Sequence, residues 1–104
     1  MANKMLGQHW LNDPIALKAI TESAQIRPTD TVLEIGPGHG SLTKYLTSEA
    51  GRVVAVELDP ELFEKLPTKV PAKNLEVIRA DILKFDFGAL PVGYKVVALS
   101  LIHI

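Results

Sequence analysis

The stretch VLEIGPGHG, Val32 to Gly40, places three glycines at alternate positions directly after a run of mainly apolar residues. Because glycine has no Cβ, Gly36 permits a sharp turn after a strand, Gly38 lets the backbone approach a ligand, and Gly40 lets a helix start close to the sheet. The stretch therefore predicts a buried strand, a tight loop that can hold a ligand, and a helix. A tight turn without a ligand is the alternative that these residues leave open.

Segments typical of strands and of helices alternate outward from this loop. Helices are expected at about residues 14 to 26 and after Asp59-Pro60, because Asp13-Pro14 and Asp59-Pro60 each supply an N-cap and a proline before spaced apolar residues. A further helix is expected after Ser41, where apolar residues mark one face. Strands are expected over Thr31 to Gly36, Arg52 to Leu58, Asn74 to Asp81 and Tyr94 to Ile104. This alternation implies an α/β fold with a Rossmann-like parallel sheet joined by right-handed crossovers.

The composition fits one soluble globular domain and excludes several classes of function. The 104 residues carry 11 Lys+Arg and 12 Asp+Glu, so the formal net charge of -1 provides no overall basic field for nucleic acid. The chain has no cysteine and its three histidines are scattered, so neither a disulfide framework nor a metal site is expected. No run is long enough to cross a bilayer, and the first residues do not resemble a signal peptide. The expected location is the cytoplasm.

Acidic residues at the expected strand ends indicate which ligand the loop serves. Glu57, near the end of the second strand, can accept hydrogen bonds from the two hydroxyls of a ribose, and Asp81, at the end of the third, can accept from the amine of an adenine. Helix or turn capping is the alternative role for each. The glycine spacing is not G-x-G-x-x-G, and the loop lacks the lysine of a P-loop. A nucleoside site without a pyrophosphate cradle indicates S-adenosylmethionine rather than NAD.

Four segments then carry a family resemblance. They are GQHWLNDP (Gly7 to Pro14), VLEIGPGHGSLT (Val32 to Thr43), VVAVELD (Val53 to Asp59) and VIRADILKFDF (Val77 to Phe87). In this order and spacing they resemble the N-terminal part of the ribosomal RNA adenine dimethyltransferases. The resemblance extends from about residue 4 to residue 98 and implies a class I, S-adenosylmethionine-dependent methyltransferase fold, truncated after about the fourth parallel strand.

The resemblance implies cofactor contacts at five positions of this sequence. His9 and Leu11 would lie in a segment that folds over the cofactor, and Gly36 would lie against its methionine part. Glu57 would hold the ribose and Asp81 would flank the adenine. No metal is implied.

The family reaction moves methyl groups from the cofactor to the exocyclic amines of two adjacent adenosines near the 3′ end of small-subunit rRNA. The resemblance thus implies that rRNA, or a precursor of the small subunit, is the partner. An Asn-x-Pro-aromatic motif after the fourth strand binds the amine in the family, but Leu99 stands where the asparagine is expected. As written, the chain is expected to lack catalytic residues and to be inactive on adenine.

Residues 1–104 are accordingly expected to form a partial cofactor-binding domain without the family's C-terminal helical domain. The resemblance places the fourth strand beside the first, so the run Val96 to Ile104 is expected to be an apolar edge that promotes association. Because the sequence departs abruptly from the family pattern at Leu99, we expect that the last six residues reflect a fragment or a misread end of the gene.

Other classes of function remain open at this stage. The chain could belong to another methyltransferase, such as a large-subunit rRNA resistance methylase or an enzyme acting on a small molecule. It could be a non-catalytic module that binds S-adenosylmethionine or RNA. A nicotinamide-dependent oxidoreductase is a further alternative.

Overall fold

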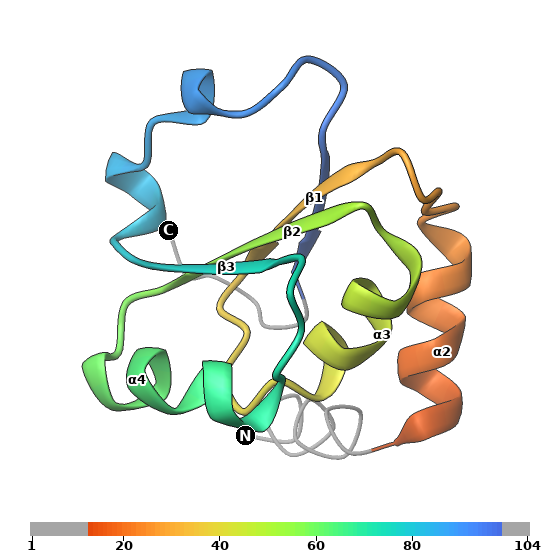
Figure 1. The fold of residues 1–104 in the computed structure, drawn as a ribbon, viewed down its shortest axis with the longest axis horizontal. Helices are drawn as coiled ribbons and strands as arrows, with labels where there is room; N and C mark the ends of the chain where they lie inside the picture. The colour runs from red at the N-terminus through yellow and green to blue at the C-terminus, as the bar shows by residue number, and fades with distance from the viewer. Residues whose placement is uncertain (1–12, 99–104) are drawn as a thin grey trace, which may run out of the picture.

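The structure, a computed structural model, describes residues 13–98. In that range the chain forms a four-stranded parallel sheet with strand order β3-β2-β1-β4. The strands are β1 (Thr31–Ile35), β2 (Arg52–Glu57), β3 (Leu75–Arg79) and β4 (Lys95–Ala98). The predicted α/β class is confirmed, and so is the placement of the fourth strand beside the first (Figure 1).

Three α-helices connect or precede the strands. They are α2 (Pro14–Ser23), α3 (Ser41–Glu49) and α4 (Pro60–Lys69). The two predicted cap-and-proline starts are confirmed, because the Asp13 carboxylate accepts from the Ile15 N–H and the Asp59 carboxylate accepts from two N–H groups of α4. Two short 3₁₀ helices, η1 (Ile82–Lys84) and η2 (Phe87–Ala89), occupy the predicted loop between β3 and β4.

Helix α2 is shorter than the sequence predicts. It ends at Ser23 rather than near residue 26, and Ala24 forms its C-cap. Gln25 then adopts a left-handed conformation with φ of 52°, which cannot continue a helix. The apolar spacing that predicted the longer helix continues past this point because Ala24 and Ile26 still pack against the core.

Strands β1, β2 and β3 are also shorter than predicted, and the end of the predicted fourth strand, residues 99–104, lies outside the described residues. Gly36 has a positive φ of 65°, so β1 stops at Ile35. Asp81, which was predicted inside the third strand, instead caps η1. Asn74, predicted as the start of that strand, donates from its side chain to the carbonyls of Thr47 and Ala50 near the end of α3.

The two faces of the sheet are covered differently. The three α-helices lie on one face, while the segment from β3 to β4, with η1 and η2, covers the other (Figure 1). The buried residues under the helices are Leu17, Val32, Leu42, Leu46, Ala50, Val53, Ala55, Leu66, Val70 and Val97. Those on the opposite face are Leu33, Val54, Val56 and Leu90. Strands buried on both faces read as continuous apolar runs, as β1 and β2 do.

A polar junction fixes the N-terminal ends of the strands. The Asp30 carboxylate accepts from the Arg27 N–H at 2.7 Å and pairs with the Lys95 ammonium of β4 at 3.0 Å. The Arg27 N–H and the Lys95 side chain lower the pKa of Asp30. The Asp30 carbonyl also accepts from the N–H groups of Gly51 and Arg52. One turn thus ties β1 to both of its neighbours.

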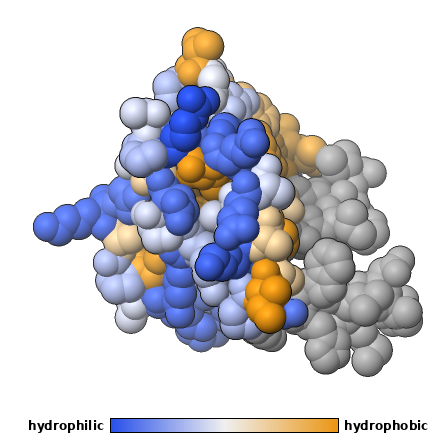
Figure 2. All heavy atoms as spheres, turned by 90° about the vertical axis from the view of Figure 1, so that its right-hand side faces the viewer, coloured by the Kyte–Doolittle hydropathy of each residue, from blue (hydrophilic) through white to orange (hydrophobic). Residues whose placement is uncertain are grey.

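The surface is mostly polar where α2 faces the viewer, with hydrophobic side chains in separate spots (Figure 2). On the edge strand β4 of the described sheet, Val96 is 52% exposed. Among the described residues, no helix has the length and apolar character required to cross a membrane.

The core under α3 provides a direct test of this packing. Leu46 is fully buried, so Leu46→Ala should lower the free energy of unfolding by about 2 to 5 kcal/mol through lost contacts and a residual cavity. Urea unfolding followed by circular dichroism measures the change. Leu83, which is 63% exposed, is the matched control, and Leu83→Ala should alter stability by no more than about 0.5 kcal/mol. Equal effects of the two substitutions would contradict the packing described here.

Candidate functional site

The carboxyl ends of three neighbouring strands meet at one edge of the sheet, which we call the ligand edge. Parallel pairing places Ile35 opposite Val56, and Glu57 opposite Arg79. The predicted residues Gly36, Glu57 and Asp81 therefore follow or end β1, β2 and β3 at the same edge. In open parallel sheets this is where ligands bind.

The glycine loop is held by backbone hydrogen bonds and needs glycine for different reasons along its length. The Gly36 N–H donates to the Val56 carbonyl at 2.9 Å, and Gly36, Gly38 and Gly40 have positive φ values of 65°, 58° and 86°. A Cβ on Gly38 would meet nothing within 4 Å, so open space lies beside it. A Cβ on Gly40 would lie 2.7 Å from Leu66 of α4, so this glycine lets α3 start close to α4.

Glu57 ties the loop to the end of β2. One oxygen of its carboxylate accepts from the Gly38 N–H at 3.0 Å and the other accepts from the Asp59 N–H at 3.1 Å. The side chain does not cap α4, a role that Asp59 fills, and the residue is 7% exposed. Each carboxylate oxygen has two acceptor positions, so two further donors can bind to the same group.

Asp81 performs the capping role that the sequence left as an alternative. Its Oδ1 atom accepts from the Leu83 N–H at 2.9 Å at the start of η1. Within residues 13–98 its other oxygen has no hydrogen-bond partner, so capping does not use up the carboxylate. The neighbouring Ile82 packs on the sheet face opposite the helices.

Sequence reasoning missed a buried acid–hydroxyl pair beneath the glycine loop. Glu34 lies in β1 on the helix-covered face, and its carboxylate accepts from the Thr43 hydroxyl of α3 at 2.6 Å. Both side chains are buried, with Glu34 only 2% exposed. The signal in the sequence was an acidic residue inside an otherwise apolar strand, which calls for a specific partner because burying an unpaired charge is costly.

The environment of Glu34 favours its neutral form. The pKa of the Glu34 carboxyl is raised from 4.5 to about 7; burial is the main cause, the negative charge of Glu57 acts in the same direction, and the Thr43 hydrogen bond lowers the pKa. Near neutral pH the carboxyl is therefore present in both protonation states. This group lies one residue before the end of β1.

Several predicted positions lie outside the described residues. These are the cofactor contacts His9 and Leu11, and Leu99 at the expected asparagine position. His39, to which the sequence assigned no role, is exposed in the glycine loop with its Nδ1 atom 2.9 Å from the Lys69 ammonium.

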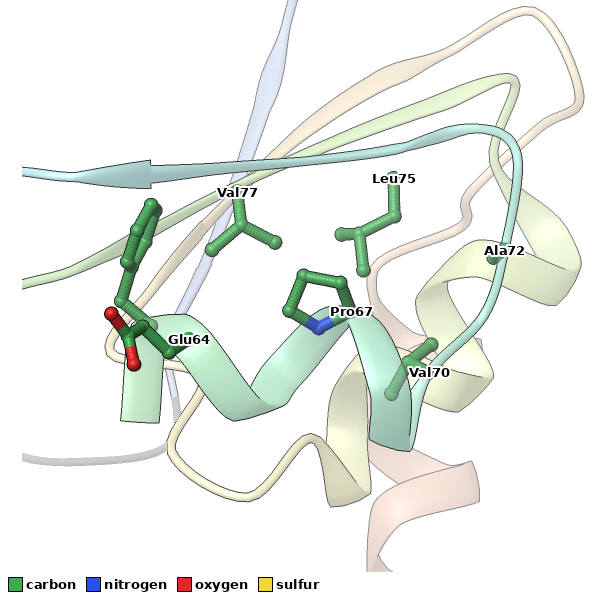
Figure 3. Close-up of a pocket in the computed structure, with 7 residues that line it drawn as sticks. Glu64, Pro67, Val70, Ala72, Leu75 and Val77 are labelled. Atoms are coloured by element: carbon green, nitrogen blue, oxygen red, sulfur yellow. The ribbon is translucent and has the colours of Figure 1, made fainter. Parts of the chain in front are cut away.

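Two other features do not point to the ligand edge. No group of three or more metal-ligating side chains occurs in the part of the chain that the structure describes. A hollow of about 510 Å³ lies between α4 and β3 and is lined by Phe63, Glu64, Pro67, Val70, Ala72, Leu75 and Val77 (Figure 3). Its lining combines apolar side chains with the carboxylate of Glu64 and includes none of the three predicted site residues, so it is separate from the ligand edge.

Comparison with known proteins identifies similar sequences. The family described as "Ribosomal RNA adenine dimethylase" matches residues 1–98. The chain is 49% identical over 84 residues to a probable ribosomal RNA small subunit methyltransferase A of Methanopyrus kandleri, and 44% identical over 88 residues to the dimethyladenosine transferase of Saccharomyces cerevisiae. These matches cover 80% and 81% of this chain but 30% and 28% of the relatives. The chain thus spans less than a third of their length.

Solved structures are similar in fold. The 23S rRNA methyltransferase ErmE superimposes with a TM-score of 0.76 and 36% identity over 84% of this chain and 35% of that one. Together with the four-stranded parallel sheet, this confirms the predicted Rossmann-like methyltransferase fold, of which residues 13–98 contain four strands.

The glycine loop yields a paired prediction. Alanine at Gly38 or Gly40 must adopt a left-handed conformation, which costs about 1 to 2 kcal/mol. Gly40→Ala should cost about 1 to 3 kcal/mol more than Gly38→Ala, because its methyl group collides with Leu66 and Val70. Thermal unfolding of the two variants in parallel measures the difference. Equal melting temperatures would show that α3 does not pack this closely on α4.

The buried acid yields a prediction about pH. Folding raises the pKa of Glu34, so this group makes its full contribution to the free energy of unfolding below pH 4.5. The contribution falls as the pH rises to about 7 and is constant above that. The free energy of unfolding decreases by about 3 kcal/mol in total over this range. Glu34→Gln keeps an acceptor for Thr43 and should remove this slope from the free energy of unfolding measured between pH 5 and 8. A slope unchanged by the substitution would assign it to another group.

Proposed function

Because this chain belongs to the ribosomal RNA adenine dimethylase family, we propose that it forms the cofactor-binding part of an S-adenosylmethionine-dependent rRNA adenine N6-methyltransferase. The observation that carries the proposal is the ligand edge, where a glycine loop and two carboxylates follow three neighbouring strands. The chain spans only part of its relatives' length, so the activity, the RNA and the partners belong to the proposal.

The ribose side of the cofactor fits Glu57. Its carboxylate is fixed by the Gly38 and Asp59 N–H groups and keeps acceptor positions free. Two adjacent hydroxyls of a ribose are donors that can use these positions. Such charge-assisted hydrogen bonds are stronger than neutral ones, and the fixed side chain loses little conformational freedom when they form.

The remaining contacts are distributed along the same edge. Gly36 is exposed and bears no side chain, so its backbone can lie against the methionine part of the cofactor. Asp81 has one carboxylate oxygen available to accept from the adenine amine while the other caps η1. His9 and Leu11 complete the proposed cofactor-binding set. When bound, the cofactor supplies an electrophilic methyl group on a positively charged sulfur.

The proposed acceptor is the exocyclic amine of adenine in RNA. Its lone pair is delocalised into the base, so orientation and hydrogen bonding must provide most of the rate enhancement. Residues 1–104 then form the N-terminal part of the methyltransferase domain, and the groups that hold the target base are not among the described residues. We propose two adjacent adenosines near the 3′ end of small-subunit rRNA as the target and the small subunit or its precursor as the partner.

The names of two relatives, a small subunit methyltransferase and a dimethyladenosine transferase, support this target. The structural likeness to a 23S rRNA methyltransferase supports large-subunit rRNA as a second candidate. Binding of the chain to fragments of the two rRNAs distinguishes them. A cytoplasmic location is part of the proposal.

Cofactor binding tests the proposal at Glu57. Glu57→Ala should weaken binding of S-adenosylmethionine by about 10- to 100-fold, because it removes charged hydrogen bonds worth about 1.5 to 3 kcal/mol each. Isothermal titration calorimetry measures the affinity. Glu64→Ala, on the exposed side of α4, is the control and should bind like the wild type. Unchanged affinity in Glu57→Ala would move the ribose site elsewhere, and binding of NAD in place of S-adenosylmethionine would contradict the proposed class.

A further inference from the structure

Glu34 is a buried ionisable group that the proposed function does not yet use. It lies in β1 two residues before Gly36, and its register partner Ala55 lies two residues before Glu57, so Glu34 is close to the strand ends that form the ligand edge. Its carboxylate is bound by the Thr43 hydroxyl at 2.6 Å and is 2% exposed. Water therefore does little to screen its charge, and interactions with a nearby ligand charge are strong.

No positive side chain balances Glu34 within the described residues. Burial is the main cause that raises the pKa of Glu34, and the neighbouring Glu57, which is also negative, raises it too. Thr43 contributes a hydroxyl from α3, while the parts of β4 and β2 paired with Glu34 are Val97 and Ala55, which are apolar. A cation arriving at the ligand edge is the charge that this arrangement lacks.

The proposed cofactor brings such a cation. S-adenosylmethionine carries a positive sulfonium sulfur, and transfer of the methyl group leaves S-adenosylhomocysteine, in which the sulfur is a neutral thioether. The two molecules otherwise have the same nucleoside and the same amino acid part. A buried carboxylate near the methionine part can therefore distinguish substrate from product by charge.

We propose that Glu34 is a positioning residue that releases its proton when the sulfonium cofactor binds, so that the site prefers the substrate cofactor over its neutral product. This inference rests on the proposed function and names one determinant of its cofactor specificity. Glu34 acts through its charge and through the Thr43 hydroxyl, which keeps the carboxylate under the loop.

Linkage determines how the preference depends on pH. A ligand that stabilises ionised Glu34 binds more tightly as the pH rises through the range in which Glu34 of the free protein loses its proton. At a lower pH, where Glu34 of the free protein is still protonated, binding of the same ligand releases that proton. The thioether product lacks the charge that drives this release. The ratio of the two dissociation constants, product over substrate, should therefore increase on the order of five- to tenfold between pH 6 and pH 8.

Calorimetric titration of the 104-residue chain with each cofactor form from pH 6 to pH 8 tests the proposal. The ratio should rise in the wild type and in Glu64→Gln, and its rise should be lost in Glu34→Gln. Any pH dependence of the ratio that arises from titration of the ligands themselves appears equally in all three proteins. His39 is the imidazole of the glycine loop, so His39→Gln is measured as well and should retain the rise.

Proton release provides a second readout. Binding enthalpies in buffers of different ionisation enthalpy should show that the substrate cofactor releases more protons than the product, and that Glu34→Gln removes the difference. If Glu34→Gln does not fold, Thr43→Val serves instead. Loss of the hydroxyl disfavours the ionised carboxylate, so the rise in the ratio should move to higher pH.

The outcomes separate this inference from the proposed function. Tight binding with the same pH dependence of the ratio in wild type and Glu34→Gln overturns the role of Glu34 and leaves the proposed function intact. Failure of both cofactor forms to bind at any pH overturns both. A rise that disappears in His39→Gln but remains in Glu34→Gln would assign the linkage to the loop histidine and overturn the inference.

Discussion

The parallel pairing of β1 with β2 is the constraint on which the rest of the structure depends. It is the centre of the four-stranded sheet, both of its faces are covered, and its valines are almost completely buried. Because the two strands run in the same direction, they end at the same edge. The Gly36 N–H extends the pairing by donating to Val56, so the glycine loop starts from a fixed point. Every group at the ligand edge takes its position from this pair.

The same pairing brings two buried acids to neighbouring strand ends. Glu57 is satisfied by two backbone N–H groups, whereas Glu34 is satisfied by one side-chain hydroxyl. Backbone donors cannot rotate away, so Glu57 is well prepared for a ligand at fixed geometry. The single hydroxyl beside Glu34 leaves its charge state sensitive to what lies above it. The two buried glutamates thus differ in the kind of donor that holds their carboxylates.

The fold class, the order of the elements and the edge that carries the candidate site could be predicted from the sequence, because glycine spacing, helix caps and β-branched runs are local signals. The ends of the elements could not. Helix α2 ends where Gln25 takes a left-handed conformation, and no residue type required that. The roles of Asp81 and Glu34 also depend on neighbours from other elements. The Glu34–Thr43 pair joins a strand to a helix, and only its unusual place in an apolar run was visible beforehand.

The position of Asp81 at the start of η1 has a consequence for the connection from β3 to β4. That connection is made of two short 3₁₀ helices, and few of its residues are buried. Such segments open at a lower free energy than the strands they join. The same carboxylate caps the first turn of this connection and is the proposed acceptor for the adenine amine. A nucleoside that bound to it would reduce the conformational entropy of the segment that covers the sheet's opposite face, and the order of the chain beyond β3 would then be partly a property of the bound state.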